Sequence, residues 1–170
     1  QSSGMSDYEL IIDRLSDSRW KEGRNLRLEA LQKEPQAFSS TFEEEAHLSE
    51  EEWITRNRNA LYAFIDDELV GMMVIFISEN PMTQHIANIF GVYVQESHRG
   101  MGIGRQLIEQ SILILRENNQ ISKLKLSVST EQVAAMRLYE KLGFERVGIQ
   151  KNEFYFNERF YDDLLMELHL

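Results

Sequence analysis

Residues 91–144 read GVYVQESHRGMGIGRQLIEQSILILRENNQISKLKLSVSTEQVAAMRLYEKLGF. The stretch opens on the end of an apolar strand pattern, passes through RGMGIG at residues 99–104, and continues with apolar residues at helical spacing. Residues 124–128 alternate as a strand, residues 131–142 form a second helical pattern, and Gly143 stands where a left-handed helix cap is favoured. Strands interleaved with helices predict a mixed α/β domain.

The sequence before this stretch predicts further strands and helices. Residues 8–15 read as a strand, an amphipathic helix follows and ends before Pro35, and residues 36–47 read as a loop. Ser49 and Glu52 form a capping-box pattern that begins another helix. The surrounding acidic run is therefore interpreted mainly as solvated helix ends, and an acidic wall that attracts an amine is the alternative.

Further strands complete the predicted sheet. Residues 61–65 and 69–78 read as a hairpin, residues 85–94 read as another strand, Phe144 starts a further strand, and residues 164–170 alternate as a final strand. The pattern predicts a mixed α/β sheet with helices on its faces in one domain, residues 5–170. Residues 1–4 precede a methionine and are interpreted as a cloning remnant.

Composition restricts the classes of function. The formal net charge of −10 disfavours binding to a nucleic-acid backbone, although a local basic patch around Arg99 and Arg105 can still receive an anion. No cysteine is present, and four scattered histidines lack the spacing of a metal site, so no metal is expected. The apolar stretches are too short to span a membrane, which predicts a cytoplasmic protein without a membrane partner.

The segment RGMGIG has the features of an anion-binding turn. It stands between a strand and a helix, where unpaired N–H groups and the helix dipole attract negative charge, and glycine lets a diphosphate come close. Arg99 and Arg105 are expected to add charge-assisted hydrogen bonds. The segment is neither GxGxxG, because Arg105 replaces the third glycine, nor a P-loop.

Two motifs together resemble the GNAT superfamily of acetyltransferases. Arg99, Gly102 and Gly104 match its Arg/Gln-x-x-Gly-x-Gly/Ala signature, and LYEKLGF at residues 138–144 matches its second signature. The resemblance implies an α+β fold with a mixed, mostly antiparallel sheet of about seven strands flanked by about four helices. Its central strand pair splays to receive acetyl-CoA, and the pantetheine arm of the cofactor pairs with the backbone like an added strand. The residues that the resemblance assigns to the cofactor are Val92, Tyr93, Val94, Arg99, Gly100, Met101, Gly102, Ile103, Gly104, Arg105 and Gln132.

The same resemblance assigns Tyr139 as general acid. A phenol with a pKa near 10 is protonated at pH 7 and can protonate a departing thiolate. A core aromatic without a catalytic role is the alternative. The resemblance also implies that a backbone N–H near Val92 stabilises the oxyanion.

Two positions depart from the family pattern. Gln132 replaces the usual asparagine before the second helix, and the strand HIANIFGVYV lacks the glutamate that serves many members as general base. His85, Glu96 and Glu131 are the nearest titratable groups in sequence, and water-mediated proton loss is the alternative. A base matters because an alkyl amine with a pKa near 10.4 is only about 0.04% neutral at pH 7.

The sequence therefore predicts an acetyl-CoA-dependent N-acetyltransferase that acts by direct attack of a primary amine. A small amine or polyamine is the expected acceptor, and a peptide or protein amine and an amino acid remain open. A catalytically weak acyl-CoA-binding module and an interaction protein that reuses the fold are the rival functions. A homodimer is compatible with the sequence.

Overall fold

A computed structural model describes residues 8–170, which form a seven-stranded sheet in the order β1-β2-β3-β4-β5-β7-β6. The strands are β1 (Leu10–Asp13), β2 (Ala60–Ile65), β3 (Glu68–Ile77), β4 (Ile86–Val94), β5 (Lys123–Ser129), β6 (Glu145–Phe156) and β7 (Arg159–His169). The helices are α1 (Trp20–Lys33), α2 (Phe42–Ala46), α3 (Glu50–Asn57), α4 (Ile103–Glu117) and α5 (Val133–Lys141). The predicted mixed, mostly antiparallel sheet is confirmed, with five helices instead of about four. The prediction for residues 1–4 lies outside the described residues.

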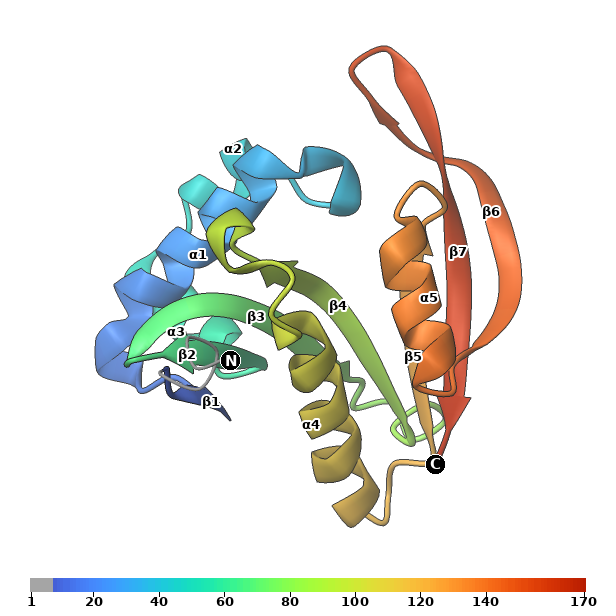
Figure 1. Ribbon diagram of the computed structural model, residues 1–170, viewed down its shortest axis with the longest axis horizontal. Helices are drawn as coiled ribbons and strands as arrows, with labels where there is room; N and C mark the ends of the chain where they lie inside the picture. The colour runs from blue at the N-terminus through green and yellow to red at the C-terminus, as the bar shows by residue number, and fades with distance from the viewer. Residues whose placement is uncertain (1–7) are drawn as a thin grey trace, which may run out of the picture.

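Helices cover both faces of the sheet. Strand β2 is buried at five of its six positions because α4 packs on one face and α1 on the other (Figure 1). This explains why the β2 sequence ALYAFI is almost continuously apolar and does not alternate. Leu61 and Ala63 belong to the core on the α4 face, and Tyr62 and Phe64 belong to the core on the α1 face.

The sheet opens between β4 and β5, which are the only parallel pair among the strands of residues 8–170. The two strands pair at Ile86 with Lys123, Ala87 with Leu124 and Asn88 with Lys125, and then diverge (Figure 1). Residues 89–94 of β4 consequently have no strand partner on the β5 side. The splayed central pair that the sequence implied is present, and it leaves a row of backbone donors and acceptors for a ligand.

A β-bulge bends β4 within this open section. The register with β3 shifts between the pairs Val74–Phe90 and Met72–Tyr93, and Gly91 inside the shift has a φ of +64°. A left-handed residue in a bulge is most easily a glycine, because other residues pay a steric cost there. The bulge bends the strand at the edge of the opening.

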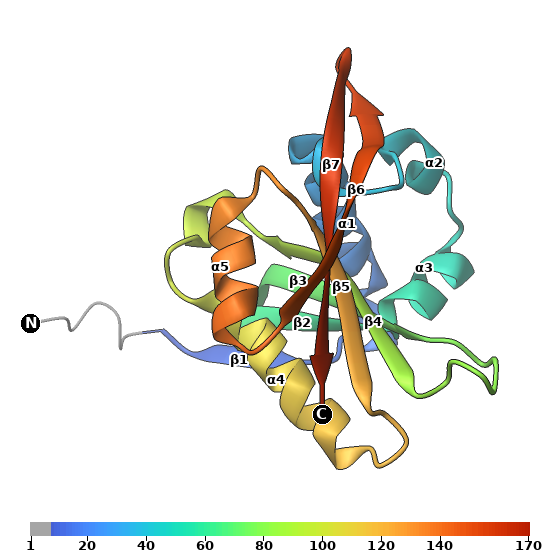
Figure 2. The same cartoon turned by 90° about the vertical axis from the view of Figure 1, so that its right-hand side faces the viewer.

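Two-residue turns close the hairpins. Asp66 and Asp67 between β2 and β3 have φ values of 49° and 70°, and Asn157 and Glu158 between β6 and β7 have values of 55° and 60°, as hairpin turns of the mirror-image type require. The long β6–β7 hairpin projects beyond the rest of the molecule (Figure 2). The predicted start of the last strand at residue 164 is wrong, because β7 begins at Arg159 and its first residues project into solvent without apolar alternation.

The predicted loop at residues 36–47 contains the short helix α2. Thr41 and Glu44 form a capping box there, which is the same device that Ser49 and Glu52 provide for α3, as predicted. Five residues are too few for a visible helical period, so only the cap could have indicated this helix. Within residues 8–170, no helix is long and apolar enough to cross a membrane.

Candidate active site

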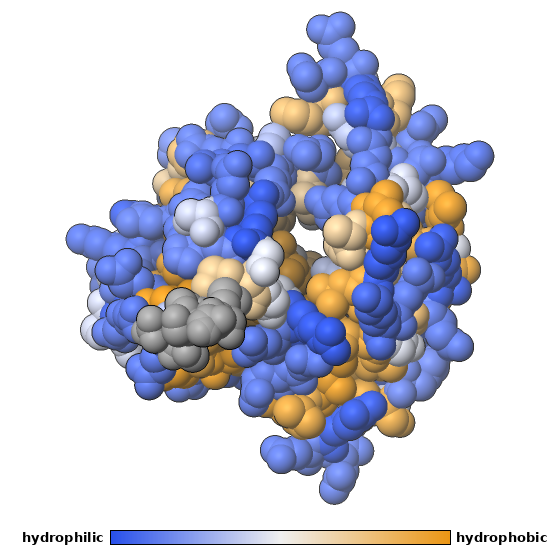
Figure 3. Space-filling model, in the orientation of Figure 1, coloured by the Kyte–Doolittle hydropathy of each residue, from blue (hydrophilic) through white to orange (hydrophobic). Residues whose placement is uncertain are grey.

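A cleft lies where β4 and β5 diverge, and the space-filling view shows an opening between the two halves of the molecule (Figure 3). Its walls come from the open section of β4, the facing part of β5, the segment after α1, helix α5 with the residue before it, and the β6–β7 hairpin. Arg27 of α1 and Arg56 of α3 also line it. Residues of both sheet faces line it, including Tyr139 on one side and Asp163 on the other. The cleft therefore passes through the sheet and does not merely indent one face.

The glycine-rich turn presents free backbone donors at the start of α4. Gly100 and Gly102 have φ values of +82° and +78°, and a Cβ built on either would meet nothing within 4 Å. The first helical bond runs from the Gln106 N–H to the Gly102 carbonyl at 3.0 Å. Within the described chain, no group accepts a hydrogen bond from the N–H groups of residues 100–105. The turn therefore fits an anion such as a diphosphate.

The two arginines of this turn are already paired. The Arg99 guanidinium donates to the Val94 carbonyl at 3.1 Å and forms an ion pair with Glu34. Arg105 pairs with Glu109 one helical turn away, at 3.1 Å. The expected charge-assisted bonds from both guanidinium groups would require these pairs to rearrange, so the anion-binding capacity of the turn rests mainly on its backbone.

The strand residues expected to contact the cofactor differ in orientation. Val92 lines the cleft. Tyr93 points to the opposite face, where its hydroxyl donates to Glu29 at 2.6 Å and burial raises its pKa. Val94 accepts the hydrogen bond from Arg99 through its carbonyl. Tyr93 is therefore available to a ligand in the cleft only through its main chain.

Helix α5 brings two of the predicted residues to the cleft. Tyr139 is 7% exposed, and its ring packs edge-on against Phe144 with centroids 5.9 Å apart. Among the described residues, its hydroxyl has no hydrogen-bond partner, and burial raises its pKa to about 12. Gln132 precedes the helix, lines the same cleft and makes no capping bond with its side chain. Both side chains are thus free to contact a ligand.

A buried carboxylate that sequence reasoning missed, Asp163, lines the same cleft as Tyr139. Asp163 on β7 is 6% exposed, and burial raises its pKa although Ser127 donates a hydrogen bond to it. Leu164, the next residue, points into the apolar core, so Asp163 occupies the opposite face of the strand. A buried carboxylate with a raised pKa in a cleft is a candidate proton acceptor.

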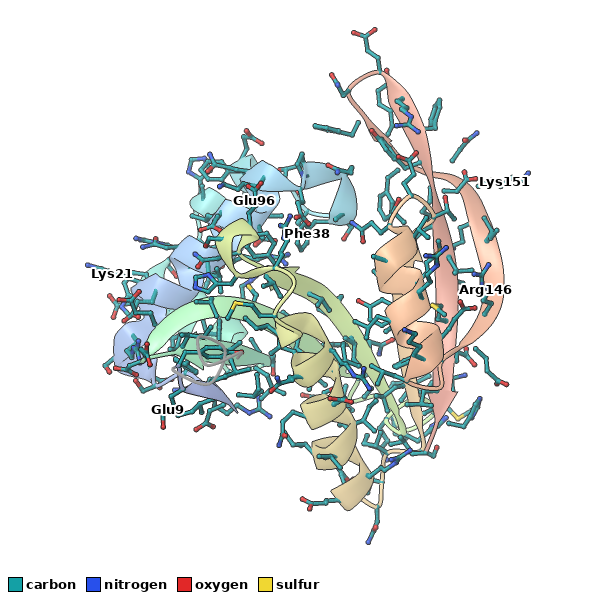
Figure 4. The ribbon with its side chains drawn as sticks, in the orientation of Figure 1. Glu9, Lys21, Phe38, Glu96, Arg146 and Lys151 are labelled. Carbon is teal, nitrogen blue, oxygen red and sulfur yellow. The ribbon has the colours of Figure 1, made fainter. Side chains whose placement is uncertain are left out.

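The three candidate bases from the sequence lie elsewhere. The His85 carbonyl accepts a bond from the Ser122 N–H at 2.9 Å, at the closed end of the β4–β5 pair. Glu131 forms an exposed ion pair with Arg159. Glu96 follows β4 and lies on the same side of the opening as α1 (Figure 4). None of the three lines the cleft.

A buried ion pair lies beside the cleft, which Arg27 lines. Arg27 on α1 is 7% exposed, and its Nε and Nη2 donate to the two oxygens of Glu45 at 2.9 and 3.0 Å. Arg56 on α3 reaches the same carboxylate at 3.0 Å. Burial alone would raise the pKa of Glu45, but the two guanidinium groups outweigh it and hold the pKa below its usual range.

Weak signals for these residues exist in the sequence. Arg27 follows Leu26 on the apolar stripe of α1, where a charge is unusual. Glu45 stands in the acidic run that was interpreted as solvated helix ends. That interpretation holds for Glu44 and Glu52, which cap helices, and is wrong for Glu45, which is buried. No local sequence pattern distinguishes the buried Glu45 from the capping residues Glu44 and Glu52.

Substitution of Gly91 tests the bulge at the cleft edge. A Cβ here would lie 2.8 Å from Arg27 Nη1, on a backbone with a φ of +64°. We expect Gly91→Ala to lower the free energy of unfolding by about 1–2 kcal/mol, because both the left-handed backbone and the close approach resist a side chain. Urea denaturation measures this. Gly148→Ala is the control, since nothing lies within 4 Å of its Cβ, and equal stability of the two variants would contradict the explanation.

Comparisons with known proteins agree with this geometry. The model of the acetyltransferase (GNAT) family matches residues 24–144. An L-amino acid N-acetyltransferase of Escherichia coli (strain K12) is 25% identical over 138 residues, which cover 78% of this chain and 84% of that protein. A streptothricin acetyltransferase of Escherichia coli is 36% identical over 87 residues, 51% of this chain and 47% of that protein. The solved structure of yncA from Salmonella typhimurium with its cofactor acetyl-CoA has a TM-score of 0.82 at 16% identity, covering 95% of this chain and 94% of that one.

Proposed function

Because the chain belongs to the GNAT family of acetyltransferases, we propose that it moves the acetyl group of acetyl-CoA directly to a primary amine held in the cleft between β4 and β5. Membership of the family, first inferred from RGMGIG and LYEKLGF, makes the chain an acetyl-CoA-dependent N-acetyltransferase. The observation that carries the proposal is one cleft whose lining includes both a phenol and a carboxylate.

Acetyl-CoA is assigned to the open edge of β4 and the turn before α4. The free N–H groups of residues 100–105 offer hydrogen bonds to its diphosphate, and Arg99 and Arg105 supply nearby positive charge. The unpaired backbone of residues 89–94, Val92 included, offers hydrogen bonds to the pantetheine arm. Gln132 faces the same space and can contribute its amide.

The transfer step uses one proton donor and one proton acceptor. Asp163 takes one proton from the ammonium group of the acceptor, which frees the nitrogen lone pair to attack the thioester carbon. The carbon–sulfur bond breaks, the sulfur leaves with the bonding electrons, and Tyr139 gives its proton to that sulfur. The second proton that the nitrogen loses on forming the amide passes to solvent. The products are free CoA and an N-acetyl amine, and solvent returns both side chains to their starting states.

The surroundings of Tyr139 and Asp163 support their roles as proton donor and proton acceptor. Burial raises the pKa of Tyr139 to about 12, so the phenol is protonated at neutral pH and can act as an acid. Burial raises the pKa of Asp163 above its ordinary value, which makes its carboxylate a stronger base than a solvated aspartate. The absence of cysteine leaves no thiol for a covalent acyl-enzyme, in agreement with direct attack.

The first test is release of free thiol. We expect the protein, incubated with acetyl-CoA and a panel of amino acids, polyamines and peptides, to release CoA in the presence of at least one class, as measured with a thiol reagent. Mass spectrometry of the acetylated product identifies the acceptor. Calorimetric binding of CoA without acetyl transfer to any amine would favour the acyl-CoA-binding module instead, and failure to bind CoA would favour an interaction protein.

A further inference from the structure

Within residues 8–170, two buried side-chain nitrogens lack a hydrogen-bond acceptor, and both belong to residues that line one pocket. They are Arg27 Nη1 and Trp53 Nε1. The pocket lies between α1, α3 and the sheet, and it shares Arg27, Arg56 and Phe90 with the cleft. Since buried N–H groups are nearly always paired, two such donors beside one hollow indicate a ligand that brings oxygen acceptors.

The geometry around Arg27 holds its free nitrogen in a fixed place. Glu45 accepts hydrogen bonds from Nε and Nη2 of the guanidinium, and the centroid of the Phe38 ring lies 4.9 Å from its central carbon. Phe38 itself stands at the opening between the two halves of the molecule (Figure 4). Nη1 approaches the Gly91 position so closely that a Cβ there would lie 2.8 Å away. The donor is therefore preorganised at the bulge where pocket and cleft meet.

The charge of this region is opposite to that of the whole chain. Arg27 and Arg56 together carry two positive charges against the single negative charge of Glu45, which leaves one net positive charge at the pocket. The chain as a whole has a net charge of −10. Asp163 lies on the other side of the cleft, so an acceptor there meets a positive group and a carboxylate at different points. This arrangement matches a zwitterion.

The remainder of the pocket is mostly apolar. The apolar side chains that line it are Trp53, Ala60, Tyr62, Met72, Val74, Phe76 and Phe90. Phe76 and Phe90 are about half exposed, at 49% and 47%, which is unusual for phenylalanine on a sheet covered by helices. A ligand with an apolar side chain would cover them.

We propose that the acceptor is a free α-amino acid with an apolar side chain, whose carboxylate is bound by Arg27 and whose side chain enters the pocket. The inference rests on the proposed acetyl transfer and names its acceptor class. It also replaces the polyamine expected from the acidic composition, because a polyamine has no anion for Nη1 and would place positive charge beside two arginines.

The substrate itself provides the first test. We compare kcat/KM for L-phenylalanine with that for phenethylamine, which lacks only the carboxylate, using thiol release from acetyl-CoA at saturating concentration. The expected preference for the amino acid is about 10- to 100-fold, as one charge-assisted hydrogen bond supplies. Equal or faster acetylation of phenethylamine would overturn the proposal while leaving the acetyltransferase activity in place.

Two double variants test whether Arg27 causes the preference for L-phenylalanine over phenethylamine. In the double variant Arg27→Gln with Glu45→Gln, which removes both partners of the buried pair, the preference for L-phenylalanine should fall to about threefold or less. The control is Arg146→Gln with Glu140→Gln, which removes an exposed pair on the outer side of the molecule and should keep the preference (Figure 4). Circular dichroism checks folding. A folded Arg27 variant that still prefers L-phenylalanine contradicts the assignment, and if the variant does not fold, the substrate comparison decides alone.

Calorimetry separates this inference from the transfer reaction. The intact protein with bound CoA is titrated with L-phenylalanine and with phenethylamine. Binding of the amino acid at least tenfold tighter than the amine supports a carboxylate site even if no acetyl group is transferred. Absence of amino-acid binding overturns the site even if other amines are acetylated.

Discussion

Tyr139→Phe is expected to lower kcat by about 10²–10³-fold while CoA affinity and stability stay nearly unchanged. The substitution removes one hydroxyl that has no hydrogen-bond partner among the described residues and keeps the ring that packs on Phe144. The departing thiolate would then have to take its proton from water. Steady-state thiol release gives kcat, and calorimetry gives the dissociation constant of CoA.

The Tyr139 prediction has a pH component and a control. Because burial raises the pKa of Tyr139 to about 12, the wild-type phenol stays protonated between pH 7 and 10, so its titration should not lower kcat in that range. Tyr8→Phe, in a tyrosine before the first strand and outside the cleft, should change neither kcat nor affinity. A Tyr139→Phe enzyme with wild-type kcat would remove the phenol from the mechanism.

Asp163→Asn is expected to lower the rate at pH 7 by about 10²-fold or more, with a deficit that shrinks as pH rises. Asparagine keeps the shape of the side chain and cannot take a proton from the amine. At pH values below the pKa of the amine, the neutral fraction of the amine rises about tenfold per pH unit. Alkaline solution therefore supplies the neutral amine that Asp163 would otherwise have produced. Initial rates between pH 6 and 10 measure the effect, and a deficit independent of pH would argue against a base.

Stability distinguishes a catalytic from a structural role of Asp163. Burial raises the folded-state pKa of this carboxyl, so its ionisation disfavours the folded state as pH rises above the unfolded value of about 3.9 and through the raised value. The neutral amide avoids that cost. We therefore expect the melting temperature of Asp163→Asn at pH 7 to equal or exceed that of the wild type, and the difference to vanish below about pH 4. A clear loss of stability at pH 7 would indicate a structural role.

The sequence predicted the parts of this molecule that are encoded locally. The turn before α4 depends on glycines that are close together in sequence. The helix that carries Tyr139 is indicated by its helical spacing of apolar residues and by Gly143 after its end, whose φ is +104°. Such signals need only a few adjacent residues. The outer part of the β6–β7 hairpin was not predicted, because it faces solvent on both sides and therefore shows no alternation.

The residues around the proposed acceptor site could not be found in this way. Arg27 and Glu45 come from different helices, and Asp163 comes from the last strand, so their arrangement at or beside one cleft depends on the packing of distant segments. In the sequence each is one charged residue among many. Only burial, which the tertiary fold decides, distinguishes Glu45 from the solvated glutamates beside it.

Because β4 and β5 diverge, bound acetyl-CoA would also have a structural role. Three residue pairs join the two strands, and beyond them the halves of the sheet are held mainly by the apolar core under α4 and α5. A pantetheine arm hydrogen-bonded along residues 89–94 would extend the ladder that those three pairs begin. The cosubstrate then acts as a temporary eighth strand, and by mass action its binding opposes separation of the two halves.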